Sequence, residues 1–201
     1  MAVDFGGECS IVLDSSAVIN LNATERATEI LGAFSNKMIV TEIVFDELEQ
    51  DEMYGYDDGS KLRILLDKEF VELVRLSGEQ LLIYRGLVAG NARQSLADGE
   101  ASTIAYAVVH DAVAVIDDRK ASKLCARQFT NLRVLTTIEL LLHKIVQSHL
   151  GHQDWEEAIY LALRAAKMYV PPELVSTVVS LIGIAKAADR TSLPRHARMN
   201  P

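Results

Sequence analysis

The sequence is poor in the residue types that build disulfide-stabilised or extended proteins. It contains two cysteines and four prolines among 201 residues, which excludes a disulfide framework and a collagen-like chain. Long hydrophobic runs are also missing: the segment 174–185 is too short to span a bilayer, and residues 1–10 lack the basic start and apolar core of a secretory signal. We therefore expect a globular protein of the reducing cytoplasm that binds no membrane.

Basic residues are outnumbered as well. The chain has 20 Lys and Arg against 28 Asp and Glu, which gives a formal net charge of −8. Because a phosphate backbone is held mainly by Lys and Arg, this balance excludes a protein that binds nucleic acid by bulk positive charge. The charge is uneven, however: residues 42–58 hold eight acids and no Lys or Arg, whereas residues 119–127 hold four basic residues and no acid. An acidic region and a basic strip can therefore coexist in one domain.

Short apolar runs alternate with helical patterns, which is typical of βαβ units and a parallel sheet. The expected strands are 11–13, 38–40, 70–74, 112–116 and 132–135, each apolar or nearly so, as expected where both faces of a sheet are covered. The expected helices are 16–33 (as one or two), 41–53, 60–68, 77–90, 98–109 and 119–128, followed by 137–149, 154–167 and 171–187. We predict an α/β domain over residues 1–140, a helical extension over 141–188 that packs on it or dimerises with it, and a flexible basic tail over 189–201.

Six acidic residues lie just after an expected strand, at the start of an expected helix or within a helix that begins just after a strand. In an open α/β sheet the ligand crevice lies outside the carboxyl ends of the strands, so carboxylates at these places can converge on one site. The residues that meet this description are Asp14, Glu47, Asp98, Glu100, Asp117 and Asp118.

Each acid also has a purely structural interpretation. Asp14, Asp98 and Asp117 precede helices, and Asp is among the best N-cap residues. Glu100 would favour the positive end of a helix dipole, and Glu47 lies in an acidic stretch that a solvated helix face explains. Only the joint pattern of these acids favours a functional site.

Carboxylates crowded into one cleft repel each other unless cations neutralise them. Mg²⁺ and Mn²⁺ suit a site made of oxygen ligands, whereas zinc would need His or Cys ligands. His143, His149 and His152 lack the partners of a structural zinc site. Divalent ions of this kind bridge a phosphodiester, activate water and stabilise the leaving oxygen, so phosphodiester hydrolysis is the reaction that the pattern predicts.

Four segments of the sequence, in this order and spacing, resemble the motifs of the PIN-domain nucleases. They are Ile11-Val12-Leu13-Asp14-Ser15-Ser16, Val40-Thr41-Glu42-Ile43-Val44-Phe45-Asp46-Glu47-Leu48, Asp98-Gly99-Glu100-Ala101 and Val115-Ile116-Asp117-Asp118-Arg119-Lys120-Ala121. The resemblance spans about residues 10–140. The C-terminal helices resemble the extension of a longer prokaryotic PIN subgroup with Gly-Glu-Ala at its third motif.

This resemblance implies a PIN-like fold with a central parallel sheet and a Mg²⁺- or Mn²⁺-dependent ribonuclease. Such enzymes cut single-stranded RNA or structured RNA loops, and many are the toxin of a toxin–antitoxin pair. The resemblance therefore also implies an RNA substrate, a small antitoxin protein as a partner, and a homodimer.

The resemblance assigns roles to individual residues. Asp14 matches the first acid, a metal ligand, Ser15 the small hydroxyl residue that supports it, and Glu47 the second acid. In most of the family the third acid is an Asp one turn into the site helix; here Glu100 occupies that place and Asp98 lies two residues earlier, so either can be the ligand.

The fourth motif departs from the family, which usually has Thr or Ser near its last acid. Asp117 and Asp118 stand there together, and we rank them equally. The resulting set of catalytic residues is Asp14, Glu47, Glu100, Asp117 and Asp118, with Asp98 as a further possible metal ligand. In this interpretation bound ions, rather than a side-chain base, activate the water.

Basic residues follow the last motif at helical spacing. Arg119, Lys123 and Arg127 fall on one face of the helix 119–128, where they either contact substrate phosphates or form a solvated face; the sequence does not separate these alternatives. Trp155, Tyr160 and Tyr169 lie within apolar patterns, so we expect them to pack rather than to stack on bases.

Three rival functions deserve comparison. An Asp after the first strand is also the nucleophile of aspartyl-phosphate phosphatases, but these need a second Asp two residues later, and Ser16 stands there. A PIN-like module without catalysis, used for binding or assembly, is disfavoured by the complete acid set. A nuclease that acts on DNA remains an alternative to the ribonuclease.

Overall fold

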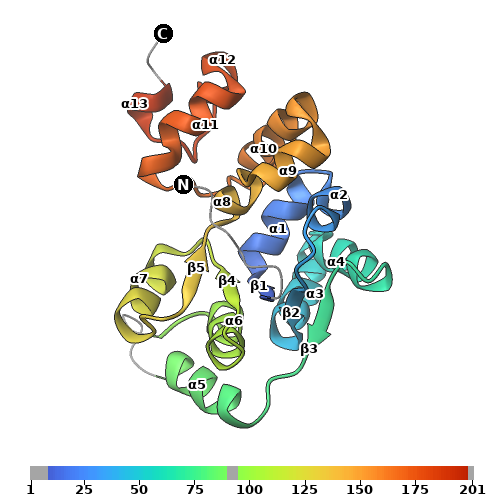
Figure 1. Ribbon diagram of the computed structural model, residues 1–201, viewed down its shortest axis with the longest axis vertical. Helices are drawn as coiled ribbons and strands as arrows, with labels where there is room; N and C mark the ends of the chain where they lie inside the picture. Colours follow the sequence, from blue (N-terminus) through green and yellow to red (C-terminus); the bar gives the residue numbers. More distant parts are fainter. Residues whose placement is uncertain (1–8, 90–94, 199–201) are drawn as a thin grey trace.

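A five-stranded parallel sheet lies at the centre of the computed structural model, which describes residues 9–89 and 95–198 (Figure 1). Its strands stand in the order β3-β2-β1-β4-β5. They are β1 (Ile11–Leu13), β2 (Met38–Thr41), β3 (Glu72–Val74), β4 (Val113–Val115) and β5 (Arg133–Leu135). The chain thus forms the α/β, PIN-like fold with a central parallel sheet that the sequence predicts.

Burial distinguishes the central strands from the edges. Ile11 of β1 pairs with Met38 of β2 on one side and with Val113 of β4 on the other, and all three strands are buried throughout. Edge strands β3 and β5 begin with exposed Glu72 and Arg133. The expected burial is therefore found in β1, β2 and β4, whereas the edge strands, which have a neighbouring strand on one side only, begin with exposed charged residues.

Helices cover both faces of the sheet in the α/β part of the chain. They are α1 (Ser15–Ala23), α2 (Ala27–Gly32), α3 (Glu42–Asp51), α4 (Asp58–Asp67), α5 (Gly78–Val88), α6 (Asp98–Val109) and α7 (Arg119–Gln128), with a 3₁₀ turn, η1 (Glu52–Tyr54), after α3. Because successive strand residues point to opposite faces, Ile11 and Leu13 pack in one core with α1 and α4. Val12 packs in a second core with α6 and α7.

Helices also form the rest of the described chain. They are α8 (Thr137–Leu141), α9 (Lys144–Leu150), α10 (His152–Ala165), η2 (Pro172–Leu174), α11 (Val175–Ile182), α12 (Ile184–Ala187) and α13 (Arg195–Arg198). The single helix expected over 137–149 is two helices, because the His143 side chain accepts a hydrogen bond from the Ile145 amide and caps a new helix there. Figure 1 shows α9 and α10 next to α1 and α2, and α11, α12 and α13 farther from the sheet.

The extension is packed on the α/β part through α1 and α2, which contact α10 and α9 respectively. Trp155 is buried in this interface, and its indole Nε1 donates to the Leu141 carbonyl at 2.7 Å. Tyr160 lies under two cations, with Lys186 Nζ 4.8 Å and Arg190 Cζ 5.2 Å from its ring centre. Both aromatic side chains therefore serve packing, as a buried indole and a cation–π platform do.

The segment after α12 differs in part from the expected flexible tail. Leu193 is buried, and α13 contacts both α11 and α12. Burial of the Leu193 side chain anchors this short segment on the helices, although the segment is otherwise mostly polar. Residues 199–201 lie outside the described residues. No helix within residues 9–89 and 95–198 is long and apolar enough to cross a membrane.

Candidate active site

Asp14 lies at the carboxyl end of β1 and is almost fully buried, with 1% of its surface exposed. Its Oδ1 accepts a hydrogen bond of 2.7 Å from the Ala17 amide and so caps α1. Its Oδ2 is buried without a hydrogen-bond donor among the described residues. Burial, reinforced by the nearby carboxylates of Asp117, Glu100 and Glu47, raises the pKa of Asp14 well above its usual value. Capping therefore accounts for one oxygen of Asp14 and leaves the other unexplained.

Glu47 approaches this site from α3 and is held by its neighbours. The Ser15 hydroxyl donates to Glu47 Oε2 at 2.7 Å. Gly99 at the start of α6 lies against both groups: a Cβ on Gly99 would stand 2.5 Å from Glu47 Oε2 and 2.6 Å from Ser15 Oγ. Glycine at this position lets the first turn of α6 reach the two side chains, and Ser15 touches Glu47 rather than Asp14.

The two candidates for the third acid point to different surroundings. Glu100 is half-buried, and its pKa is raised by burial and by the carboxylates of Asp118 and Glu47. Asp98 is exposed and accepts a hydrogen bond of 2.5 Å from the Tyr84 hydroxyl of α5, which raises the pKa of Tyr84 to about 12. The structure therefore brings Glu100 to the other acids and leaves Asp98 on the side that faces α5.

Asp117 follows β4 and has 8% of its surface exposed. The Thr137 amide donates to its Oδ1 at 2.8 Å, and the Thr137 hydroxyl and the Asn20 amide nitrogen each donate to its Oδ2 at 2.6 Å. Burial raises the pKa of Asp117, although these hydrogen bonds oppose the rise. These bonds occupy both oxygens of the Asp117 carboxylate, whose charge in turn raises the pKa of Asp14.

Asn20 and Thr137 are site residues that the sequence analysis missed. Thr137 comes shortly after strand β5, so a search for polar residues at the carboxyl ends of the strands would have identified it. Asn20 and Asn22 are the buried amides among the apolar residues Ala17, Val18 and Leu21 of α1, and a buried polar side chain within a hydrophobic pattern is itself a signal of a specific partner.

Asp118 plays two parts. Its Oδ1 accepts from the Lys120 and Ala121 amides at 2.7 and 2.8 Å and caps α7. Its charge also raises the pKa of Glu100, so the side chain lies near the site. The structure thus associates both members of the Asp pair with the other acids, one through Asp14 and one through Glu100.

Three of these acids, Glu100, Asp117 and Asp118, line a cleft of about 330 Å³. Lys167 and Tyr169 of the C-terminal extension also line it. We call this cavity the acidic cleft. The extension therefore contributes directly to the surroundings of the site.

The donor set suits a hard divalent cation, although the ligands are not gathered into a closed cage. Within the described ranges, no three His, Cys, Asp or Glu side chains form a group that could hold a metal ion as they lie, because several carboxylate oxygens accept hydrogen bonds instead. The site nevertheless offers oxygen ligands of the kind that Mg²⁺ and Mn²⁺ prefer. The buried, donorless Oδ2 of Asp14 is the acceptor that a cation would satisfy.

The basic residues of α7 do not share one surface. Exposed Arg119 and Lys123 line a groove of about 620 Å³ beside the acidic cleft, whereas Arg127 lines a different cavity, next to α5. Eight residues of an α-helix turn through about 80° more than two full circles. Arg127 therefore lies about 80° around the helix axis from Arg119. The expected continuous basic face is therefore limited to Arg119 and Lys123.

The fold and the acids together define a class: an α/β domain whose carboxylates gather where parallel strands end, as in enzymes that bind ligands at that edge. The chain belongs to the PIN-domain family, since the model of a family described as PIN domain matches residues 10–184. PIN domains are typically nucleases and generally use divalent metal ions, which supports a nuclease-type function. No curated protein matches the sequence.

Proposed function

We propose that this PIN-domain protein is a Mg²⁺- or Mn²⁺-dependent endoribonuclease that hydrolyses phosphodiester bonds of single-stranded or structured RNA in the cytoplasm. The observation that supports it best is the Asp14 carboxylate, which is buried with one donorless oxygen and surrounded by three further carboxylates. Such an arrangement is costly for a protein that uses it only to cap a helix. A divalent cation would offset the repulsion among these charges.

Asp14, Glu47 and Glu100, together with one or both of Asp117 and Asp118, would hold the ions. When bound, divalent ions supply activation of the attacking water and stabilisation of the leaving oxygen. The chain's own residues prepare that chemistry by fixing the carboxylates. Ser15 donates to Glu47, while Asn20 and Thr137 hold both oxygens of Asp117.

Arg119 and Lys123 would bind the phosphates of the substrate beside the acids. Both are exposed and form no ion pair with a carboxylate in the described part of the chain. A strand lying along α7 would place its backbone next to the acidic cleft without requiring a basic protein overall. This local arrangement reconciles the net charge of −8 with a nucleic-acid substrate.

The test is a cleavage assay with the full chain, single-stranded RNA and Mn²⁺. We expect Asp14→Asn to lower the rate by about 10²–10³-fold, the cost of removing one electrostatic stabiliser of a reaction. Chelation of the metal should abolish cleavage, and Glu72→Gln, at an exposed acid of β3 that does not line the acidic cleft, serves as the matched control that retains activity. Metal-independent cleavage, or equal activity of the wild type and Asp14→Asn, would contradict the proposal, and single-stranded DNA in parallel separates the DNA-directed alternative.

Calorimetric titration with Mn²⁺ tests the assignment of the third ligand in the same proteins. Glu100→Gln should weaken binding more than Asp98→Asn, because Glu100 lies with the other acids and Asp98 faces Tyr84. The reverse order would reassign the ligand to Asp98. Binding of Mn²⁺ without any cleavage would instead favour the binding or assembly module.

A toxin role, with a small antitoxin protein as partner and a homodimer as the assembly, is part of the proposal through the family relationship alone. Induced expression should arrest growth, and co-expression of a neighbouring gene product should relieve the arrest. Growth that continues during expression of an active enzyme would remove the toxin role and leave the nuclease.

A further inference from the structure

Two cavities at the carboxyl end of the sheet adjoin at one residue, Tyr169. It lines the acidic cleft together with Glu100 and Asp117. It also lines the 620 Å³ groove in which Arg119 and Lys123 stand on α7; we call this second cavity the α7 groove. Tyr169 is half-buried and belongs to the link between α10 and η2, so one aromatic side chain of the extension borders both spaces.

Three cations surround this junction without carboxylate partners. Arg119, Lys123 and Lys167 are exposed, and none of them is among the described basic residues that form ion pairs, which are Arg26, Lys37, Lys61, Arg63, Arg75 and Lys186. Other described basic residues are also without an ion pair; these three are distinguished because they line the two adjoining cavities. Unpaired cations beside an acidic site are available to an anionic ligand that spans both cavities.

Lys167 lines the acidic cleft and has an unfavourable backbone conformation. Its φ is +54°, in the left-handed region that a residue with a Cβ adopts at a cost. Glycine is the usual residue two positions after a helix end such as that of α10. Glu25, Glu69 and Asp111 also have positive φ, so the conformation is not by itself a sign of function, but it makes glycine a substitution that removes the Lys167 side chain without straining the backbone.

We propose that Tyr169 is a base-stacking platform of the substrate path, and that a single RNA strand runs from the α7 groove across Tyr169 into the acidic cleft. Arg119 and Lys123 contact phosphates on one side of the platform, and Lys167 contacts a phosphate on the other. The inference rests on the proposed ribonuclease function and adds that the C-terminal extension supplies one wall of its substrate site.

The chemistry of the junction favours an unpaired strand over a duplex. Stacking on an aromatic side chain requires a base whose face is free, and it is tolerant of sequence because every base has such a face. Cations on both sides of the ring then fix the flanking phosphates. This arrangement assigns Tyr169 a role different from the packing role expected from the sequence.

Two carboxylates, Glu139 and Glu173, also line the α7 groove and would repel a phosphate backbone there. Glu139 accepts hydrogen bonds from the Thr136 amide and hydroxyl at 2.8 and 2.7 Å, so its charge is engaged in capping α8. Glu173 is exposed in the first turn of η2. If the strand passes here, removing the charge of Glu173 strengthens binding, which gives the test a variant with the opposite sign.

The experiment measures binding of a fluorescent, unstructured 12-nucleotide RNA to the full chain carrying Asp14→Asn, so that cleavage does not interfere. We expect Tyr169→Leu to weaken binding about tenfold, the range of one base–aromatic stack, and Tyr169→Phe to change it by less than about twofold. Tyr56→Leu, at an exposed tyrosine outside both cavities, is the matched control and should have no effect.

Salt dependence tests the cations separately. Loss of one phosphate contact lowers the slope of log affinity against log salt by about 0.7 for a single strand, and we expect this change for Lys123→Gln and for Lys167→Gly. Glu173→Gln should tighten binding. In the cleaving protein, Tyr169→Leu should raise KM about tenfold while kcat changes by less than about threefold, a split that general loss of structure would not produce.

Unchanged binding and KM in Tyr169→Leu would overturn the proposal, as would equal losses in Tyr169→Leu and Tyr169→Phe, since the hydroxyl rather than the ring would then be responsible. If Tyr169→Leu fails to fold, unchanged salt slopes in Lys123→Gln and Lys167→Gly would overturn it. The proposed nuclease fails independently: RNA binding with the expected dependence on Tyr169, but no cleavage by the wild type in Mn²⁺, would support the path and reject the reaction.

Discussion

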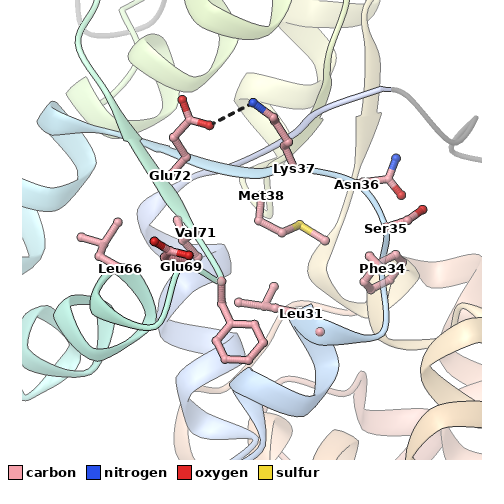
Figure 2. A pocket seen from close by; sticks show the side chains of 12 residues that line it. Leu31, Phe34, Ser35, Asn36, Lys37, Met38, Leu66, Glu69, Val71 and Glu72 are labelled. Carbon is pink, nitrogen blue, oxygen red and sulfur yellow. Dashed lines mark hydrogen bonds and ion pairs between the residues drawn. The ribbon is translucent and has the colours of Figure 1, made fainter.

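The two ends of the parallel sheet differ in how they treat charge. At the carboxyl end, Asp14 and Asp117 are buried and their pKa values are raised. At the amino end lies a cavity of about 470 Å³, and Figure 2 shows the side chains that line it, among them the apolar Leu31 and Met38. The ionisable residues that line this cavity, Lys37, Glu69 and Glu72, are all exposed.

This difference means that cavity volume and buried charge favour opposite ends of the sheet as the place of a site. The amino-end cavity is larger than the acidic cleft, yet its only ion pair, between Lys37 and Glu72 at 3.5 Å, is exposed and of a kind worth about 0–1 kcal/mol. The smaller cleft contains carboxylates that cost stability where they stand. Groups retained against their cost are better indicators of function than empty volume.

Among substitutions that leave every carboxylate in place, the largest effect expected at the carboxyl end comes from Gly99→Ala. A Cβ there would overlap Glu47 Oε2 and Ser15 Oγ, so the ends of these two side chains must shift from the positions in which they form their hydrogen bond. A shift of about 1 Å in such a group can cost about 10²-fold in rate, and we expect a loss of this size in the RNA-cleavage assay.

Gly86→Ala provides the control for that substitution. Gly86 is exposed in α5, and a Cβ there meets nothing within 4 Å, so alanine should leave cleavage unchanged and stabilise the helix by about 0.5–1 kcal/mol. Cleavage by Gly99→Ala at the wild-type rate would show that the contact between α6 and Glu47 does not position a functional group.

The second effect concerns pH and the metal-free protein. A carboxyl whose folded pKa is raised above its unfolded value destabilises the fold above the folded pKa, and the penalty is relieved as pH falls through that pKa toward the ordinary value. Since Asp14 is raised in this way, Asp14→Asn should be more stable than the wild type at pH 7.5. The advantage should shrink as the pH falls, in urea unfolding with chelator present.

The amino end again supplies the contrast. Glu72→Gln removes a carboxylate from an exposed ion pair, so its effect on the free energy of unfolding should stay within about 1 kcal/mol and below that of Asp14→Asn at pH 7.5. Addition of Mn²⁺ should stabilise the wild type and Glu72→Gln but not Asp14→Asn. An Asp14→Asn protein less stable than the wild type at pH 7.5 would mean that the cap, rather than the buried charge, dominates.

The sequence predicts the parts of this molecule that depend on chain-local rules. Asp14 and Asp117 follow strands directly, so their position at the carboxyl end follows once the strands are recognised. The alternation of Ile11, Val12 and Leu13 assigns residues to the two cores in the same way. The sheet, the four motifs and the helical C-terminal part are predictable for this reason.

What the sequence leaves open depends on the orientation of whole elements. Asp98 and Glu100 are two residues apart and so point about 200° apart on α6; only the packing of that helix decides which one faces Asp14. Thr137 and Asn20 both donate hydrogen bonds to Asp117, although they lie 20 and 97 residues from it in the sequence. No periodicity in the sequence predicts such pairs. Tyr169 lies beside the acidic cleft because the extension packs back on the α/β part.

The smallest expected effect comes from a comparison of the two ends of the sheet at two residues with the same backbone conformation. Glu69 and Lys167 each lie two residues after a helix, α4 and α10, with φ of +59° and +54°. Glycine at either position removes the same left-handed strain, so Glu69→Gly and Lys167→Gly should each raise the free energy of unfolding by about 1 kcal/mol.

The two substitutions should differ in their effect on RNA, because Glu69 lines the amino-end cavity and Lys167 lines the acidic cleft. Fluorescence binding and thermal unfolding of the same two proteins measure both properties. A more stable Lys167→Gly that binds RNA less well separates strain from function directly, since loss of structure cannot explain weaker binding by a more stable protein. Equal RNA affinity of Glu69→Gly and Lys167→Gly would instead mean that the Lys167 side chain does not bind RNA and that both residues only complete the turn after a helix.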